Sequence, residues 1–462
     1  MKLAAGADID GFRLEEPVHA GGMATLWRVT RAGEDTPLIM KIPRLSYGED
    51  PAAIVAFEVE RMILPHLTGR HVPRFVAAGD FDQPYVVLEY ITGTPLRARL
   101  DDTPLAPAEM ARIGAAIATA LDDVHGQGVI HHDVKPSNVI VRPDGPCALI
   151  DFGFARHARL PDLIAQEFHG PVGTGAYVSP EQLRGDRDDR RSDLFALGVI
   201  LYFLTTGERP FGDPTTVSEW RRRLWRDPVP PRRRNPDCPP WLQEVVLRCL
   251  EVDPIDRYAT AADVARALAD PEHIVLTERA TRTRRDSIMR VARRRWRAQH
   301  ALALQPQRTV PSTTPVIMAA LDLASGMELL ADAVRREVLR LVDAAPAATR
   351  VACVNVMKLS RIGQDEFEDA EGRNLHLRRL AELQRWARPL PLPADRLTYH
   401  VLESPDAGGA LLAFAEANSI THIVMGARAA STARRYLGSV SSKVVAEATC
   451  TVTVVRVPAP SP

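Results

Sequence analysis

The first part of the chain alternates hydrophobic and polar positions in short runs, and the period then lengthens to that of helices. Strands are predicted at FRLEEPV (12–18), TLWRVT (25–30), PLIMKIP (37–43) and YVVLEYI (85–91). Helices are predicted over residues 57–67 and over ARIGAAIATALDDVHGQG (111–128), whose closing glycines suit a helix end. The pattern therefore predicts a small β-rich lobe followed by a larger helical lobe.

From residue 316 onward, strand and helix patterns alternate. Strands are predicted at VIMAALDL (316–323), VACVNVM (351–357), RLTYHVL (396–402), ITHIVMGA (420–427) and CTVTVVRV (450–457). Helices are predicted between them, at residues 326–344, 375–387, 409–418 and 441–448. Such alternation is typical of a parallel sheet covered on both faces, so an independent α/β domain is expected.

An arginine-rich stretch separates these two regions. Between residues 278 and 308 arginine greatly outnumbers acidic residues, and a Pro/Ser/Thr patch follows. We interpret the stretch as a solvated, partly helical basic connector; a surface that docks acidic protein, nucleotide or membrane is the alternative. The expected domains are residues 1–270 (small lobe about 1–88, large lobe about 92–270), a connector at 271–314, and an α/β domain at 315–458.

Composition limits the classes of function. A chain of 462 residues is long enough for two or three domains, and its formal net charge of zero gives no signal for nucleic acid. The five dispersed cysteines indicate reduced thiols in a cytoplasmic protein. The longest apolar run, at 194–204, is too short to span a bilayer, and the amino terminus lacks the apolar core of a signal peptide.

Two motifs place phosphoryl-transfer chemistry in the first region. IHHDVKPSNVIV (130–141) carries Asp133, Lys135 and Asn138 within one short loop, and LIDFGFAR (149–156) carries Asp151 after a strand-like stretch. A proton acceptor, a cation and two oxygen ligands can thereby converge on one phosphate. The chain has only five lysines, and two of them, Lys41 and Lys135, stand at candidate phosphate positions.

With these motifs, residues 12–268 resemble the protein kinase superfamily, in particular bacterial serine/threonine kinases of the eukaryotic type. The resemblance implies a two-lobed α+β fold that uses ATP and Mg²⁺. It implies that Asp133 accepts the substrate proton, that Lys135 neutralises the transferred phosphate, and that Asn138 and Asp151 bind magnesium. Lys135, together with the docking segment GTGAYVSPEQ (173–182), favours Ser/Thr substrates.

The same resemblance implies the ATP-binding residues. VHAGGMATL (18–26) corresponds to the glycine-rich loop, where Gly21 and Gly22 approach the phosphates while Val18 and Leu26 flank adenine. Lys41 would hold the α- and β-phosphates with Glu60 as its partner on a helix, and Glu58 is the alternative partner. The backbone of Glu89 and Ile91 would pair with adenine at the hinge.

The sequence around the catalytic loop also bears on regulation and on how that loop is held in place. His132 stands where the family usually has an arginine that binds an activation-segment phosphate, and residues 152–173 contain no Ser, Thr or Tyr. We therefore predict that activity does not depend on phosphorylation of that segment. By the same resemblance, Asp193 ties down the catalytic loop and Arg257 pairs with Glu181.

The α/β region resembles the universal stress protein family, some members of which bind ATP. The matching residues are Asp322 after the first strand, Val354 on the second, and Gly426, Gly438 and Ser439 around MGARAASTARRYLGS (425–439). A phosphate loop before a helix amino terminus is one interpretation of this segment, and a tight turn with a helix cap is the other. The resemblance also implies a homodimer through the last strand.

We therefore predict a cytoplasmic, magnesium-dependent Ser/Thr protein kinase that phosphorylates protein hydroxyls, with a carboxy-terminal domain that senses stress or nucleotide. The alternative is a weakly active or inactive kinase fold that serves as an ATP-binding scaffold. A kinase for a small molecule is the third hypothesis, which the Ser/Thr-type loop disfavours.

Overall fold

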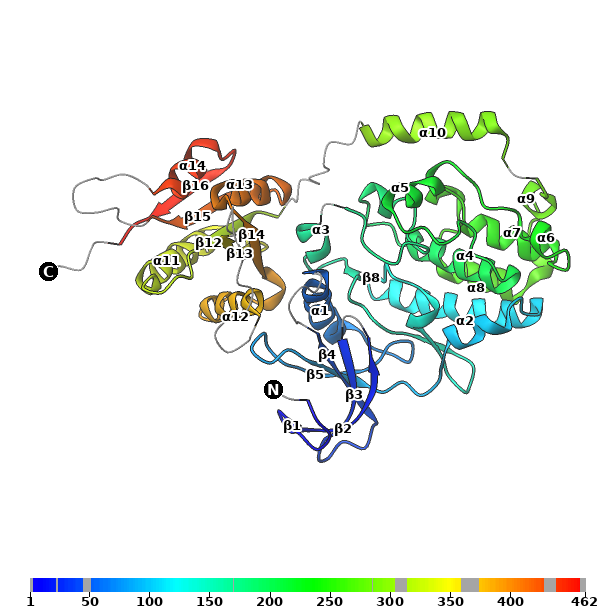
Figure 1. Cartoon of the computed structure of the whole chain (residues 1–462), viewed down its shortest axis with the longest axis horizontal. Helices are drawn as coiled ribbons and strands as arrows, with labels where there is room; N and C mark the ends of the chain where they lie inside the picture. The colour runs from blue at the N-terminus through cyan, green and yellow to red at the C-terminus, as the bar shows by residue number, and fades with distance from the viewer. Residues whose placement is uncertain are drawn as a thin grey trace. The chain divides into compact units, whose positions relative to one another are not determined.

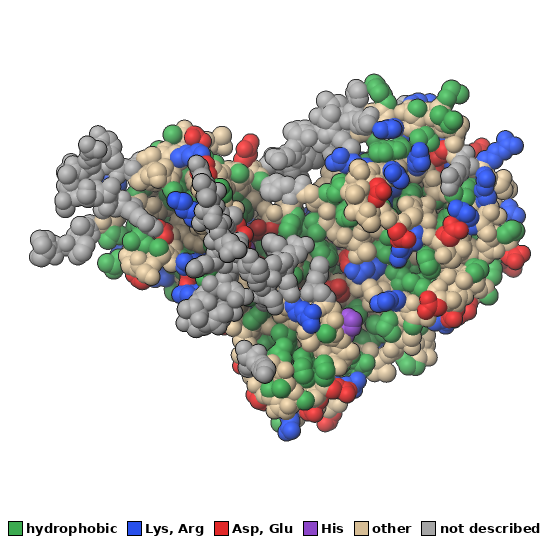
Figure 2. All heavy atoms as spheres, in the orientation of Figure 1, with side chains coloured by type: hydrophobic (Ala, Val, Ile, Leu, Met, Phe, Trp, Pro, Cys, Tyr) green, Lys and Arg blue, Asp and Glu red, His purple; other side chains and the backbone are tan. Residues whose placement is uncertain are grey.

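The computed structural model of the chain describes residues 3–21, 24–44, 51–168, 170–284, 286–303, 314–358, 374–427 and 438–457 (Figure 1). The chain divides into two compact units. The first contains residues 1–42, 55–78 and 86–306, and the second contains residues 307–462 with two short segments, 43–54 and 79–85. Basic and acidic side chains are interspersed on the face shown in Figure 2, consistent with the balanced formal charge.

The amino-terminal lobe is an antiparallel six-stranded sheet with one helix beside it. Its strands are β1 (Asp8–Ile9), β2 (Phe12–Ala20), β3 (Ala24–Thr30), β4 (Leu38–Pro43), β5 (Phe75–Ala78) and β6 (Val86–Glu89), in the order β1-β2-β3-β4-β6-β5. Helix α1 (Pro51–Ile63) continues into a 3-10 turn, η1 (Leu64–His66). Strands β2, β3, β4 and β6 lie at the four predicted positions, whereas the short β1 and β5 were not predicted.

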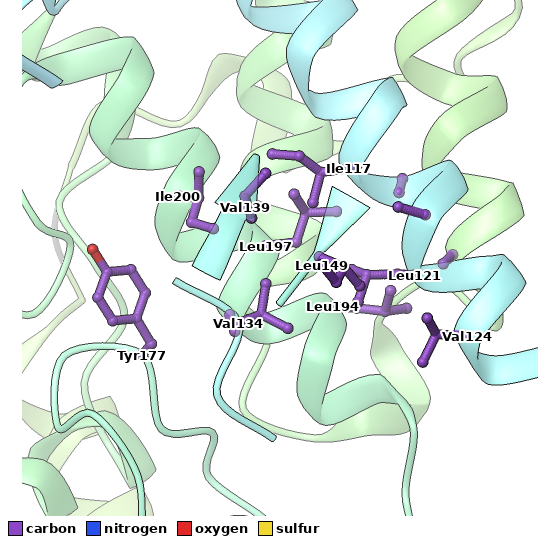
Figure 3. Close-up of a cluster of buried hydrophobic side chains, with 14 of the residues drawn as sticks. Ile117, Leu121, Val124, Val134, Val139, Leu149, Tyr177, Leu194, Leu197 and Ile200 are labelled. Carbon is purple, nitrogen blue, oxygen red and sulfur yellow. The ribbon is translucent and has the colours of Figure 1, made fainter. Parts of the chain in front are cut away.

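Four helices form the body of the second lobe: α2 (Pro107–Gly126), α4 (Arg191–Thr206), α7 (Pro240–Cys249) and α8 (Ala261–Ala269). Most of α4 is hydrophobic and buried, because both α2 and α7 pack on it. Figure 3 shows this core, with Ile117, Leu121 and Val124 from α2, Leu194, Leu197 and Ile200 from α4, and Val134, Val139 and Leu149 from the loops and strands between them.

Short elements surround the loop between α2 and α4. Two small sheets have the orders β10-β9-β7 and β11-β8 and contain β7 (Thr94–Pro95), β8 (Val129–Ile130), β9 (Val139–Val141), β10 (Cys147–Leu149) and β11 (Arg156–His157). The short helices are α3 (Leu163–Glu167), α5 (Val217–Trp220) and α6 (Pro231–Arg234). The 3-10 turns are η2 (Leu96–Asp102), η3 (Pro136–Asn138), η4 (Gln182–Arg184), η5 (Arg221–Leu224), η6 (Pro254–Asp256) and η7 (Pro271–His273).

The arginine-rich stretch is partly helical and largely exposed, as expected, but several of its arginines pair with acidic residues of the first unit. It forms α9 (Glu278–Thr281) and α10 (Ile288–Ala303), both within the first unit (Figure 1). Arg282 and Arg294 contact the Asp227 carboxylate at 2.9 and 2.7 Å, and Arg282 also contacts Asp286 at 2.7 Å. Ala298 of α10 is buried in a cluster with Val178, Leu183 and Leu224. Much of the basic charge is therefore paired within the fold.

The second unit contains a parallel five-stranded sheet with helices on both faces. Its strands are β12 (Val316–Leu321), β13 (Arg350–Lys358), β14 (Leu397–Ser404), β15 (His422–Gly426) and β16 (Thr451–Val455), in the order β14-β13-β12-β15-β16. One core includes side chains of α11 (Glu328–Ala344) and α12 (Leu375–Ala387), and the other includes side chains of α13 (Ala407–Ala417) and α14 (Ser439–Glu447). A 3-10 turn, η8 (Ala394–Arg396), precedes β14.

The sequence predicts reduced cysteines and apolar runs too short to span a membrane. All five cysteines lie in described residues and are free, and four of them are buried. Over the ranges that the structure describes, no helix is long and apolar enough to cross a bilayer.

Candidate active site

One buried carboxylate, that of Asp193 near the start of α4, holds the loop between β8 and η3. Asp193 accepts the backbone N–H groups of His131 and His132, each at 2.9 Å, and its Oδ2 lies 2.8 Å from Nε2 of His125. Burial alone would raise the pKa of Asp193, but its contacts with His125 lower the pKa to about 2. His132 has a φ of 60°, in the left-handed region, so these bonds hold a turn that side chains seldom adopt.

A second carboxylate, Asp133, is buried and oriented by both of its oxygens. Oδ2 lies 2.6 Å from Nζ of Lys135, and Oδ1 accepts the Thr174 hydroxyl at 2.7 Å and the Thr174 N–H at 3.2 Å. Nζ of Lys135 also donates to the Thr174 hydroxyl oxygen at 3.0 Å. A proton acceptor and a cation therefore lie side by side, the combination that transfer of a phosphoryl group to a hydroxyl needs.

Asn138 and Asp151 supply oxygen ligands. Nδ2 of Asn138 donates to the backbone oxygen of Asp133 at 3.0 Å and to its Oδ2 at 3.2 Å, which fixes the amide. The amide oxygen accepts a bond from Ser137 at 3.2 Å and has a second lone pair for a cation. Asp151 follows β10 with a φ of 66°. A carboxylate and an amide oxygen are hard ligands, so this pair fits a magnesium ion.

Lys41 of β4 connects the two lobes of the first unit through two carboxylates. Its Nζ lies 2.6 Å from Oε2 of Glu60 and 2.9 Å from Oδ1 of Asp151. Oε1 of Glu60 accepts the backbone N–H of Phe152 at 3.1 Å. Burial opposes the charge on Lys41, yet the two carboxylates raise its pKa above the ordinary value. Burial would also raise the pKa of Asp151, but Lys41 lowers it to about 2.

The structure places Glu60, and not Glu58, beside Lys41. Glu58 is also buried on α1, but burial raises its pKa to about 8, so it is largely uncharged at neutral pH. Burial raises the pKa of Glu60 as well, but the adjacent Lys41 cation opposes that rise and favours the charged form. The difference follows from helix geometry, because side chains two positions apart lie on different faces.

Family comparisons agree with this geometry. Residues 12–269 match the model of the protein kinase domain. The chain belongs to the protein kinase family. Residues 316–456 match the model of the universal stress protein family. The predicted fold class, a two-lobed α+β kinase fold followed by a parallel five-stranded α/β domain, is confirmed.

The similarity to individual relatives covers the kinase domain. Serine/threonine-protein kinase PknB of Mycolicibacterium smegmatis is 34% identical over 264 residues, which is 55% of this chain and 42% of the relative. Serine/threonine-protein kinase pkn3 of Myxococcus xanthus is 34% identical over 270 residues, 54% of this chain and 48% of the relative. The chain therefore spans less than half the length of these relatives. A crystal structure of the Mycobacterium tuberculosis PknI kinase domain aligns over 58% of this chain and 99% of its own, with 24% identity and a TM-score of 0.47.

The expected glycine-rich loop of the kinase domain lies at the turn between β2 and β3. Val18 is 41% exposed on β2, and Leu26 is half-buried on β3. Gly21 donates its N–H to the oxygen of Ala24 at 3.0 Å, which closes the turn between these strands. Gly22 lies outside the described residues.

The expected hinge follows β6. Glu89 is its last residue and pairs with Leu38 of β4, and Ile91 is buried with Ile140 and Ala148. The hinge is thus anchored to both lobes of the kinase domain, which suits a segment that would present backbone groups to a base. Ile39 pairs with Leu88 in the same ladder.

The substrate-docking segment of the kinase domain has two buried anchors. Arg257 makes two bonds to Glu181, at 2.6 Å to Oε1 and 2.8 Å to Oε2. Arg223 was not predicted: it is 1% exposed and donates to the backbone oxygens of Gly175 at 2.6 Å, Trp220 at 3.0 Å and Val178. Burial lowers the pKa of Arg223 to about 10. In the run RRRLWR it resembles any solvated arginine, so the sequence carries no signal for this role.

In the universal stress protein domain, the expected nucleotide residues have different surroundings. Asp322 follows β12 and is exposed, and Gly438 precedes α14, whose first residue is Ser439. Gly426 ends β15, where a Cβ atom would lie 2.6 Å from the Leu330 side chain, so close packing favours glycine there.

Val354 and the expected phosphate loop are the remaining candidate nucleotide-binding residues of the universal stress protein domain. Val354 is fully buried in β13 and pairs with Ala320 on one side and His400 on the other. Its backbone therefore lies within the sheet ladder, between β12 and β14. Residues 428–437, which include most of the expected phosphate loop, lie outside the described residues.

Proposed function

We propose that this chain is a Ser/Thr protein kinase that transfers the γ-phosphate of ATP to hydroxyl groups of proteins. The observation that carries the proposal is the Asp133 carboxylate, held between Lys135, Thr174 and Asn138 at 2.6–3.2 Å. The substrate oxygen forms a bond to the γ-phosphorus while the bond from that phosphorus to the β–γ bridging oxygen breaks. ADP leaves with the bonding electron pair, and Asp133 takes the hydroxyl proton.

The remaining side chains position the nucleotide. Lys41, fixed by Glu60, would contact the α- and β-phosphates, and Lys135 would offset negative charge on the transferred group. Asn138 and Asp151 would hold Mg²⁺, which supplies charge neutralisation on the phosphate oxygens when it is bound. Val18 and Leu26 would contact adenine, and the backbone of Glu89 and Ile91 would pair with it.

The test is transfer of labelled γ-phosphate from Mg·ATP to the protein itself and to a generic Ser/Thr acceptor. Asp133→Asn and Asp151→Ala are expected to lose transfer, and Asp101→Asn, on an exposed side chain, is the matched control. A wild-type protein that binds ATP without transferring phosphate would instead be an ATP-binding scaffold, the alternative function.

We further infer that the universal stress protein domain binds a nucleotide. Asp322 and Gly426 end neighbouring parallel strands, so both lie at the carboxyl edge of the sheet, and α14 begins just after the expected phosphate loop. ATP stoichiometry tests this in a Lys41→Met background, which weakens the kinase site. Saturable binding that Asp322→Ala removes would support nucleotide sensing, and its absence would leave only the turn-and-cap interpretation.

We also propose a homodimer through β16 and a cytoplasmic location. β16 is an edge strand of the parallel sheet, so it can add a strand from a second copy, and the free cysteines suit a reducing compartment. Light scattering coupled to size exclusion tests the dimer. A mass of one chain across a hundredfold dilution series would contradict it.

A further inference from the structure

An ion pair that does not depend on modification connects the activation segment of the kinase domain, residues 151–181, to the loop that follows it. Asp162 lies just before α3, and its Oδ2 accepts Nε of Arg187 at 2.8 Å. Nε of Arg156 lies 3.5 Å from the same oxygen. The side chains of Asp162 and Arg187 are only 15% and 11% exposed, so solvent screens this pair weakly.

Arg187 connects this pair to the catalytic loop. Its Nη2 donates to the backbone oxygen of Phe154 at 2.9 Å, three residues after Asp151. Its own backbone oxygen lies 3.0 Å from Nε2 of His132, the residue before Asp133. One arginine therefore contacts the start of the activation segment, the start of α3 and the catalytic loop.

Asp162 also caps a helix, in addition to its ion pair with Arg187. Its Oδ1 accepts the N–H of Ala165 at 3.2 Å and so caps α3. A serine hydroxyl can make this cap, but it cannot supply the negative charge that faces Arg187 and Arg156. The cap and the charge can therefore be tested separately at one position.

His132 cannot act as the cation of this region. It is 4% exposed, and burial and the nearby Arg187 charge lower its pKa to about 3, so the ring is neutral at physiological pH. The positive charges that face Asp162 come from Arg187 and Arg156. The negative charges that face these two arginines come from Asp162 and, for Arg156, also from Asp188, and residues 152–173 contain no Ser, Thr or Tyr.

We propose that Asp162 is a positioning residue whose carboxylate, held by Arg187 and Arg156, orders the activation segment permanently, as a phosphate does in a switchable kinase. The inference rests on the proposed kinase function and adds how that site is kept competent. Asp162 contacts neither Asp133 nor Lys41 in the described structure. Its loss is therefore expected to lower the population of the competent segment, and so kcat, more than the affinity for ATP.

The experiment measures kcat and the KM for ATP in the full chain after phosphatase treatment. Asp162→Ser keeps the cap and removes the charge, and about a tenfold loss of kcat is expected, with KM for ATP changed less than about threefold. Asp162→Glu is expected to recover most of the rate. Asp253→Ser is the matched control, since Asp253 caps η6 through Ile255 at 3.1 Å, and it should leave kcat unchanged.

A double-mutant cycle then tests the pair itself. Arg187→Met is expected to lower kcat about as much as Asp162→Ser, and the double variant should lose little more than either single variant. Multiplicative losses, or an unchanged kcat in Asp162→Ser, would overturn the inference. Bound ATP at wild-type affinity shows that each variant is folded. Failure of the proposed function is distinguishable, because there the wild-type protein itself would bind ATP without transferring phosphate.

Discussion

Replacing Asp193 by asparagine is expected to destabilise the kinase domain strongly, because one carboxylate serves three donors. The backbone N–H groups of His131 and His132 and the His125 ring all contact it at 2.8–2.9 Å. An asparagine side chain has only one oxygen, so its NH₂ group would face at least one of these donors. The substitution preserves volume, so the effect isolates charge and hydrogen bonding.

The magnitude has two parts. Lowering of the Asp193 pKa from 3.8 to about 2 corresponds to about 2 kcal/mol of stabilisation at neutral pH. A buried donor without an acceptor adds about 1–3 kcal/mol. We therefore expect Asp193→Asn to lower the free energy of unfolding by about 3–5 kcal/mol at pH 7.

Urea unfolding followed by tryptophan fluorescence measures this loss. Of the six tryptophans, all except Trp386 belong to the first unit, so the signal reports mainly the kinase domain. Asp102→Asn is the control, because Asp102 is 59% exposed beside Arg99 and should contribute less than about 1 kcal/mol. A loss below about 1 kcal/mol for Asp193→Asn at pH 7 would refute the reasoning.

The pH dependence gives an independent check on the sign. Because the folded pKa of Asp193 is lowered, its stabilisation is complete above the unfolded value of 3.8 and is lost as the pH falls through about 2. The charge-dependent part of the difference between wild type and Asp193→Asn should stay constant from pH 5 to pH 8 and shrink below about pH 4. A difference that grew on acidification would point to another cause.

Three further outcomes are expected. Glu60→Gln should lower kcat/KM for ATP by about tenfold or more, because Lys41 loses its buried partner. Glu58→Gln, which mimics an already neutral carboxyl group, should change kcat/KM less than about twofold. Similar losses for both variants in steady-state kinetics would contradict the assignment of Glu60. Arg223→Met should cost about 2–4 kcal/mol in urea unfolding, because backbone oxygens of the docking segment lose their donor, and an unchanged midpoint would argue against that anchor. His132 has a pKa of about 3 in the folded state, so it gains a proton when the chain unfolds at pH 5. The stability of wild type relative to His132→Gln should therefore fall by about 2 kcal/mol between pH 7 and pH 5. The same difference in thermal midpoint between the two proteins at both pH values would rule this out.

Local spacing was enough to predict the residues that share a loop or a helix face. Asp133, Lys135 and Asn138 stand within six positions, so one turn brings their side chains together without help from the rest of the fold. The choice of Glu60 over Glu58 follows from the helical period, and in the structure Glu60 lies beside Lys41 as expected. Such predictions need only the backbone geometry of a few residues.

Partners far apart in sequence were predicted only where the family resemblance supplied them, as for Arg257 and Glu181. Asp162 and Arg187 are separated by 25 positions, and Arg223 reaches backbone oxygens about 45–48 positions away. Backbone acceptors have no sequence signature, and an arginine that pairs internally has the same composition as a solvated one.

The packing of α9 and α10 bears on how a shortened protein would behave in solution. The family match ends at residue 269, but a chain cut there would lose Arg282 and Arg294, the cations beside the largely buried Asp227. It would also uncover the apolar cluster that Ala298 covers, including Leu224 and Val178. Such a surface favours self-association. Poor yield or low rate in the excised catalytic domain would then report a damaged lobe and not the absence of a signal from the second domain.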